Sequence, residues 1–177
     1  MKNSFFLFAI LLSVFACGNS EKSNSDKTQD SSNKPLSQSP CELLSETEIK
    51  NALSIPTETE TSMKEKNTTF PSCFYKWESI TWLYEVMNGH MADYAAEMSI
   101  VQVTKIKEAQ YETSVSYYKD GETIDGIGDM ATWSAKKTQL TFLYKGNLIH
   151  VHAKTSADTA SNKTKALNIA KLIIDKL

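Results

Sequence analysis

The stretch from Gln139 to Ala153, QLTFLYKGNLIHVHA, carries the clearest structural pattern in the chain. Two segments rich in apolar and β-branched residues flank Lys145-Gly146-Asn147, a tripeptide typical of a tight turn. We therefore predict two antiparallel strands, Gln139 to Tyr144 and Asn147 to Ala153, joined as a hairpin.

The segments on either side of this hairpin complete an α+β pattern. Polar loops are expected at Thr57 to Thr69 and at Glu122 to Asp129. Further strands are predicted at Cys73 to Glu78, Glu97 to Thr104 and Met130 to Ser134, with helices near Ser45 to Leu53, Ile106 to Tyr118 and Ser156 to Leu177. Because helices and strands do not alternate regularly, we expect one largely antiparallel sheet with the helices packed on one face.

Two of the helices have specific sequence signals. Ser45 and Glu48 have the spacing of a capping box, and Pro56 ends the helix that follows. Ser156 or Asp158 is expected to cap the last helix. One face of that helix carries apolar residues at helical spacing: Ala166, Ile169, Ala170, Ile173 and Leu177.

The first 17 residues read as the signal peptide of a bacterial lipoprotein. Lys2 precedes a 12-residue apolar run from Phe5 to Ala16, which is too short for the roughly 20 residues of a spanning helix. The run ends at Ala16-Cys17-Gly18, which looks like a lipobox and predicts cleavage before Cys17 and lipidation of that cysteine. An ordinary signal peptide with a chance cysteine, or a buried N-terminal helix, are the alternatives.

The next segment predicts a tether between membrane and domain. Gly18 to Ser39 is polar, and too little of it is apolar to form a core. A flexible coil of this length spans on the order of 25 Å. We therefore expect three parts: a signal peptide (1–17), a disordered polar tether (18–39) and a globular α+β domain (40–177). The protein would be lipid-anchored to a bacterial membrane, on its periplasmic or surface side.

Composition fits one domain and argues against nucleic acid as a partner. The chain has 177 residues, a formal net charge of −2, and 19 basic residues, all of them lysine. Arginine, the preferred reader of phosphates and guanines, is absent, and the lysines do not cluster.

Two cysteines remain after Cys17 is assigned to lipid. An even number of cysteines in an exported domain predicts a disulfide, Cys41–Cys73. Two free or metal-binding thiols are the alternative, but no histidine or third cysteine lies near them in the sequence.

His150 and His152 are the residues most suggestive of a metal site. Two apart in a strand, they would share a face about 7 Å apart. The simpler interpretation is that Leu148, His150 and His152 face solvent while Ile149, Val151 and Ala153 face the core. We favour that interpretation because no third ligand is evident, and we expect no cofactor.

The loop Gly126-Ile127-Gly128-Asp129 invites comparison with phosphate-binding loops. It lacks their remaining glycine, their lysine and their strand-to-helix context, so backbone geometry explains it better. Asp125 and Asp129 could act as general acid or base, but nothing in the sequence supplies a partner group.

The segment from Ile80 to Tyr94 has no clear period. Asn88-Gly89 within it fits a turn, and its aromatic and methionine side chains are expected to lie mostly in the core. Alternatively this segment is an exposed recognition loop. Its candidate binding residues are Trp82, Tyr84, Met87 and Met91.

Three motifs resemble those of a widespread group of uncharacterised bacterial lipoproteins, annotated only as a domain of unknown function. They are the helix start Pro40-Cys41-Glu42-Leu43-Leu44-Ser45, the strand Cys73-Phe74-Tyr75-Lys76-Trp77 and the segment Gly126-Ile127-Gly128-Asp129-Met130-Ala131-Thr132-Trp133. Ser45 replaces the group's threonine, and Ile80 to Tyr94 has no counterpart. The resemblance implies the two-cysteine bridge and a fold like the single-sheet domains of photosystem-associated PsbP proteins. It brings no catalytic residues.

The expected function is that of a non-enzymatic, membrane-anchored envelope lipoprotein. It would bind a protein, peptide or small ligand through the sheet face or the aromatic segment. The alternative is a metal-binding or redox-linked envelope protein that uses His150 and His152. An enzyme acting on envelope polymers through Asp125 or Asp129 is the least favoured hypothesis.

Overall fold

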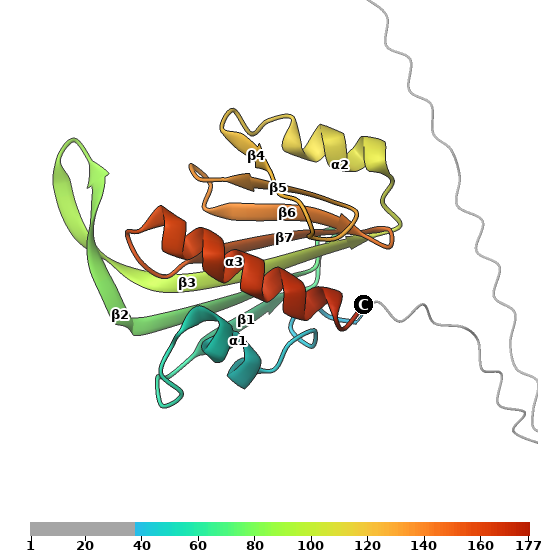
Figure 1. Cartoon of the computed structure of the whole chain (residues 1–177). Helices are drawn as coiled ribbons and strands as arrows, with labels where there is room; N and C mark the ends of the chain where they lie inside the picture. Colours follow the sequence, from blue (N-terminus) through green and yellow to red (C-terminus); the bar gives the residue numbers. More distant parts are fainter. Residues whose placement is uncertain (1–37) are drawn as a thin grey trace, which may run out of the picture. The chain divides into compact units, whose positions relative to one another are not determined.

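A computed structural model describes residues 38–177, which form one antiparallel sheet of seven strands and three helices (Figure 1). The α+β fold with a single antiparallel sheet is thus confirmed. The strand order is β1-β2-β3-β7-β6-β5-β4. The elements are α1 (Glu46–Leu53), β1 (Ser62–Lys66), β2 (Ser72–Met87), β3 (His90–Thr104), α2 (Glu108–Val115), β4 (Gly121–Thr123), β5 (Met130–Ser134), β6 (Gln139–Tyr144), β7 (Asn147–Lys154) and α3 (Thr159–Ile174).

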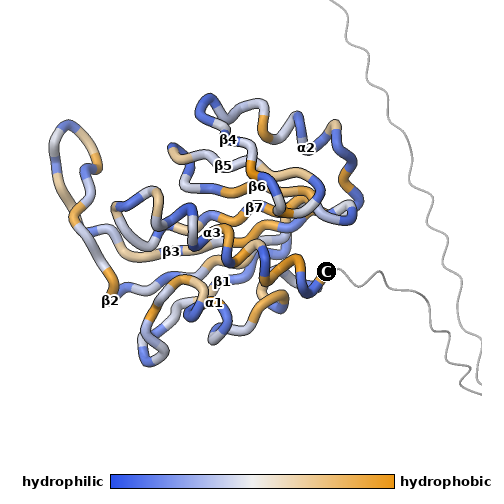
Figure 2. The backbone as a smooth tube through the Cα atoms, viewed as in Figure 1, coloured by the Kyte–Doolittle hydropathy of each residue, from blue (hydrophilic) through white to orange (hydrophobic). Residues whose placement is uncertain are grey.

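One face of the sheet, here called the core face, packs against α1 and α3. Alternate residues of the strands point to it, and the helices supply aliphatic side chains at helical spacing. Its fully buried members include Trp77, Met98, Ile100, Leu140, Phe142, Ile149 and Val151 from the sheet, and Ile49, Leu53, Ile169 and Ile173 from the helices. The apolar positions follow this layer in Figure 2.

Helix α2 lies on the opposite face of the sheet, which corrects the expectation that all helices share one face. Tyr111 of α2 packs against Leu143 and Leu148, whose neighbours Phe142 and Ile149 belong to the core face. The Tyr111 hydroxyl also bonds Thr132 Oγ1 at 2.7 Å. Leu148, expected to face solvent, is therefore buried. This opposite face, here called the second face, also carries polar side chains, among them Gln139, Thr141 and His150.

The capping signals are confirmed at both core-face helices. Ser45 Oγ accepts from the Glu48 backbone N–H, and Glu48 Oε2 accepts from the Ser45 N–H at 2.8 Å. Asp158, rather than Ser156, caps α3 by accepting from the N–H groups of Ala160 and Ser161. Helix α3 ends three residues earlier than predicted, and α2 is shorter than predicted at both ends.

The strands differ from prediction where burial does not alternate. The three strands β5, β6 and β7 lie where expected, with β7 one residue longer. Strand β1 occupies part of the expected loop from Thr57 to Thr69, and all five of its residues are exposed, so no apolar period marks it. Strand β4 likewise occupies the start of the expected loop from Glu122 to Asp129, and its three residues are exposed.

Candidate functional site

The most exposed apolar part of the described chain is a β-hairpin formed by the ends of β2 and β3. It is here called the arm and comprises Glu78 to Ala96. The arm extends from the body of the sheet (Figure 1). Neighbouring strands do not pair with it: β1 pairs with β2 only at Ser72–Lys76, and β7 pairs with β3 only from Glu97 onward.

A bulge and a tight turn set the shape of the arm. The pairing shifts between Trp77, opposite Ala96, and Thr81, opposite Ala95, so three extra residues of β2 bend the strand there. Asn88 and Gly89 form the turn with positive φ angles of 51° and 77°, as a type I′ hairpin turn requires. The turn was predicted. The expectation that the side chains of Ile80 to Tyr94 lie mostly in the core is wrong, because most of them are exposed. The segment is a bulged hairpin, not the irregular recognition loop that was the alternative.

The four candidate binding residues come together on the arm. Tyr84, Met87 and Met91 are exposed, whereas Trp82 is partly buried, with its ring 5.3 Å from that of Tyr94. Sequence reasoning missed two further exposed apolar residues here, Leu83 and Val86. The available signal was that Leu83 lies between Trp82 and Tyr84, and that Val86 lies next to Met87. The arm therefore presents aliphatic, aromatic and methionine side chains to solvent.

A lysine between two aromatic rings fixes the base of the arm. Lys154 Nζ, at the end of β7, lies 3.7 Å from the Tyr84 ring centroid and 3.9 Å from the Tyr94 ring centroid. This is cation–π geometry, which is worth about 0.5–2 kcal/mol per contact. Since Lys154 belongs to the body of the sheet, the contact connects the arm to the body.

Hydrogen bonds continue from this lysine–aromatic contact across the second face. The Tyr94 hydroxyl donates to Glu97 Oε1, which also lies 3.2 Å from His152 Nε2. The bond from His152, followed by that from Tyr94, holds the pKa of Glu97 below its usual range. Burial, with the Glu97 bond second, raises the pKa of Tyr94, so its proton stays on the hydroxyl at any physiological pH.

Both histidines of β7 face the same side, as predicted, and both already have protein partners. His152 Nδ1 lies 3.0 Å from the Lys137 carbonyl, so both its ring nitrogens are occupied. His150 Nδ1 lies 2.7 Å from Thr141 Oγ1 and 3.1 Å from Gln139 Nε2. Within residues 38–177, no group of three or more His, Cys, Asp or Glu side chains could hold a metal ion. This geometry gives the metal alternative no support.

His150 should make the stability of the domain depend on pH. Burial lowers its pKa to about 4 from an ordinary 6.5, so the unfolded chain takes up this proton first as pH falls. The free energy of unfolding should therefore fall as pH drops from 6.5 toward 4, by up to about 2 kcal/mol between pH 7 and pH 5. Urea denaturation at these two pH values measures it.

A His150→Gln variant provides the control, because it removes the titration while keeping a polar side chain. Its loss of stability between pH 7 and pH 5 should be smaller than that of the wild type. Equal losses would show that His150 does not cause the pH dependence.

The glycine-rich loop between β4 and β5 serves backbone geometry. Gly128 has a φ of 58°, and an added Cβ would lie 2.4 Å from the Leu143 carbonyl oxygen, so only glycine fits. Asp129 accepts a bond from the Lys145 N–H at 3.0 Å and thereby fixes the β6–β7 turn. Asp125 is exposed at the rim of an open hollow of about 560 Å³ beside α2. Asp129 lines the same hollow, and its carboxylate is already engaged by the Lys145 N–H.

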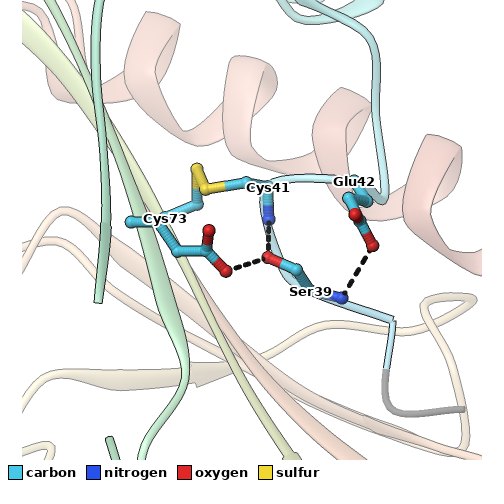
Figure 3. The surroundings of a disulfide bond; sticks show 5 residues. Ser39, Cys41, Glu42 and Cys73 are labelled. Atoms are coloured by element: carbon cyan, nitrogen blue, oxygen red, sulfur yellow. Dashed lines mark hydrogen bonds between the residues drawn. A yellow bond between two sulfur atoms is a disulfide. The ribbon is translucent and has the colours of Figure 1, made fainter. Parts of the chain in front are cut away.

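The predicted disulfide is present. Cys41 and Cys73 are bonded, with a Cα–Cα distance of 5.0 Å (Figure 3). The Ser39 hydroxyl accepts from the Cys41 N–H at 3.1 Å and donates to Glu65 Oε1 on β1 at 2.6 Å. The bridge thus joins the segment before α1 to the first residues of β2.

The membrane-related predictions fall on the N-terminal residues. Cys17, the signal peptide and nearly all of the tether lie outside the described residues. Among residues 38–177, none of the helices has the length and apolar character needed to cross a membrane. Comparisons of the chain with protein-family models, curated proteins and solved structures found no match.

Proposed function

We propose that this protein is a non-enzymatic lipoprotein of the bacterial cell envelope, anchored through Cys17, whose arm binds a partner protein. The observation that carries the proposal is the arm itself. It exposes Leu83, Tyr84, Val86, Met87 and Met91 on a hairpin that contributes little to the core. Apolar side chains gathered at such a site are characteristic of binding surfaces.

The place of the arm in the fold favours a partner away from the anchoring membrane. The chain enters the domain near Gln38, which borders the same hollow as Pro71 and Thr104. This is the end of the sheet where β2 begins. The 16 residues of β2 run from there to the turn at Asn88, a contour of about 50 Å. The tip of the arm is thus far from the point where a lipid-anchored tether would enter.

The family resemblance forms the finer part of the proposal. Membership of that lipoprotein group, with its PsbP-like form of the α+β fold, would agree with the single antiparallel sheet and with the bridge between Cys41 and Cys73. The bond that Asp129 accepts from the Lys145 N–H favours a structural role for this carboxylate over a catalytic one.

One preparation tests both halves of the proposal. A photo-crosslinking residue replaces Met91 at the tip of the arm, and the protein is irradiated in its native membrane, purified and analysed by mass spectrometry. We expect a mature chain that begins at a Cys17 carrying acyl chains, together with one defined protein adduct.

A matched variant carries the crosslinker at Tyr117, which is 75% exposed on the loop after α2, and should give no such adduct. An unlipidated chain with a free Cys17 thiol would overturn the anchoring. Equal adducts from both positions would overturn the role of the arm.

A further inference from the structure

The outer edge of β2 in the arm has unpaired backbone groups. In β3, the Gln102 N–H donates to the Pro71 carbonyl at 3.1 Å, so the even-numbered residues of β3 direct their backbone groups toward β2. Tyr94 and Ala92 continue that series and lie opposite Trp82 and Tyr84. The N–H and C=O groups of Thr81, Leu83 and Glu85 therefore point outward. No described strand pairs with them there.

Such an edge is a template for another strand. It is also apolar at its centre, because the Leu83 side chain is 65% exposed. Natural proteins usually protect free edges with lysine, proline, bulges or a covering loop. Register shifts bound this segment on both sides, but the five residues from Thr81 to Glu85 pair regularly and contain neither lysine nor proline. An edge of this kind is expected to have an occupant.

Self-pairing suits this edge better than the other edge of the arm. When a strand pairs with its own copy about a two-fold axis, the central residue lies opposite itself. On β2 the centre is Leu83, with Thr81 opposite Glu85 and Trp82 opposite Tyr84. On β3 the outward residues are Met91, Asp93 and Ala95, and centring on Asp93 would place two carboxylates against each other, which is unfavourable.

We propose that two copies of this chain pair antiparallel along the β2 edge, about a two-fold axis at Leu83. The two arms then form one four-stranded ribbon. Each outward residue exchanges two backbone hydrogen bonds with the residue opposite it. Leu83 is buried against its copy, and each Trp82 lies beside a Tyr84 of the other chain. The pairing uses Leu83 and Tyr84 of the surface proposed above but leaves Val86, Met87 and Met91 exposed for a partner protein. It can therefore fail or hold independently of partner binding at the tip.

Disulfide trapping in the native membrane tests the pairing with the full chain. Residues directly opposite in a hydrogen-bonded antiparallel pair have Cα atoms about 5.5 Å apart, within the range of a disulfide. A Leu83→Cys chain should therefore oxidise to a covalent dimer, seen on a non-reducing gel and lost on reduction. Because Cys41 and Cys73 are already bonded to each other, the new thiol has no competing partner within the domain.

Met91→Cys is the matched control, since Met91 is 47% exposed on the other strand of the same arm. We expect roughly tenfold more dimer from Leu83→Cys than from Met91→Cys, because the pairing holds only the first pair of thiols together. Thr81→Cys co-expressed with Glu85→Cys should form the mixed dimer. Equal yields from Leu83→Cys and Met91→Cys, or no dimer from either, would overturn the proposal while leaving the anchoring and partner binding untouched.

Discussion

Replacement of both Cys41 and Cys73 by serine should lower the free energy of unfolding by about 3.7 kcal/mol. The two cysteines are 32 residues apart, and closing a loop of that size restricts the unfolded chain by this amount in the chain-entropy model. A domain of this size has roughly 5–15 kcal/mol in total, so a quarter or more of its stability depends on one bond.

The structure gives a reason to expect nearly the full effect. Cys73 is completely buried in β2, and Cys41 lies just before α1, so the bridge connects the sheet to the segment that leads into the helix. Otherwise helix α1 is held mainly by α3, and strand β1 is held by its pairing with the single strand β2. Without the bridge, residues 38 to 66 should exchange their amide hydrogens faster than β5, β6 and β7.

Urea denaturation of the oxidised wild type and of the Cys41→Ser/Cys73→Ser variant, at one pH, measures the difference. The wild type with excess reductant is the control and should approach the variant. Reductant should not change the variant further. A difference below about 1 kcal/mol would mean that the unfolded chain is already compact around this loop.

The sequence predicted best those elements whose burial follows a local period. Strands β5, β6 and β7 each have alternate side chains in the core face, and α3 has its apolar face at helical spacing. The start of α1 was predicted because Ser45 and Glu48 form their capping bonds within one turn. The disulfide followed from counting cysteines. All of these signals are local or purely compositional.

The arm was not predicted because exposed residues predominate on both of its faces. Trp82 and Tyr84 are directed to one face of the ribbon and Leu83 to the other, so apolar residues follow each other without alternation. A buried strand or an irregular loop would give the same pattern. Only the tertiary structure shows that β1 and β7 stop pairing at the base of the arm.

The second face was misjudged for a similar reason. Helix α2 covers Leu143 and Leu148, and no local signal predicts on which side of the sheet a helix lies. The contacts of His150 with Gln139 and Thr141 likewise depend on the pairing of β6 with β7. The sequence did predict that His150 and His152 share a face, because that follows from alternation alone.

The second large effect is expected at Trp77, the last residue of β2 before the bulge. Its side chain is fully buried, its ring stacks on Tyr75 at 6.4 Å, and its Nε1–H donates to Thr61 Oγ1 at 2.9 Å. Trp77→Ala should lower the free energy of unfolding by about 3–5 kcal/mol, the usual cost of removing a buried aromatic side chain. Thermal or urea denaturation measures this loss.

Trp82→Ala is the matched control, because Trp82 lies on the arm, five residues further along the same strand. Its ring is partly exposed and contacts Tyr94, so its loss should cost only about 1–2 kcal/mol. Trp77→Phe should fall between the two, since it keeps a ring but leaves Thr61 without its indole donor. Equal costs at Trp77 and Trp82 would contradict the division of β2 into a part that stabilises the core and a part that is held out for binding. A large difference would mean that the surface of the arm can change with little effect on the fold, as a binding element requires.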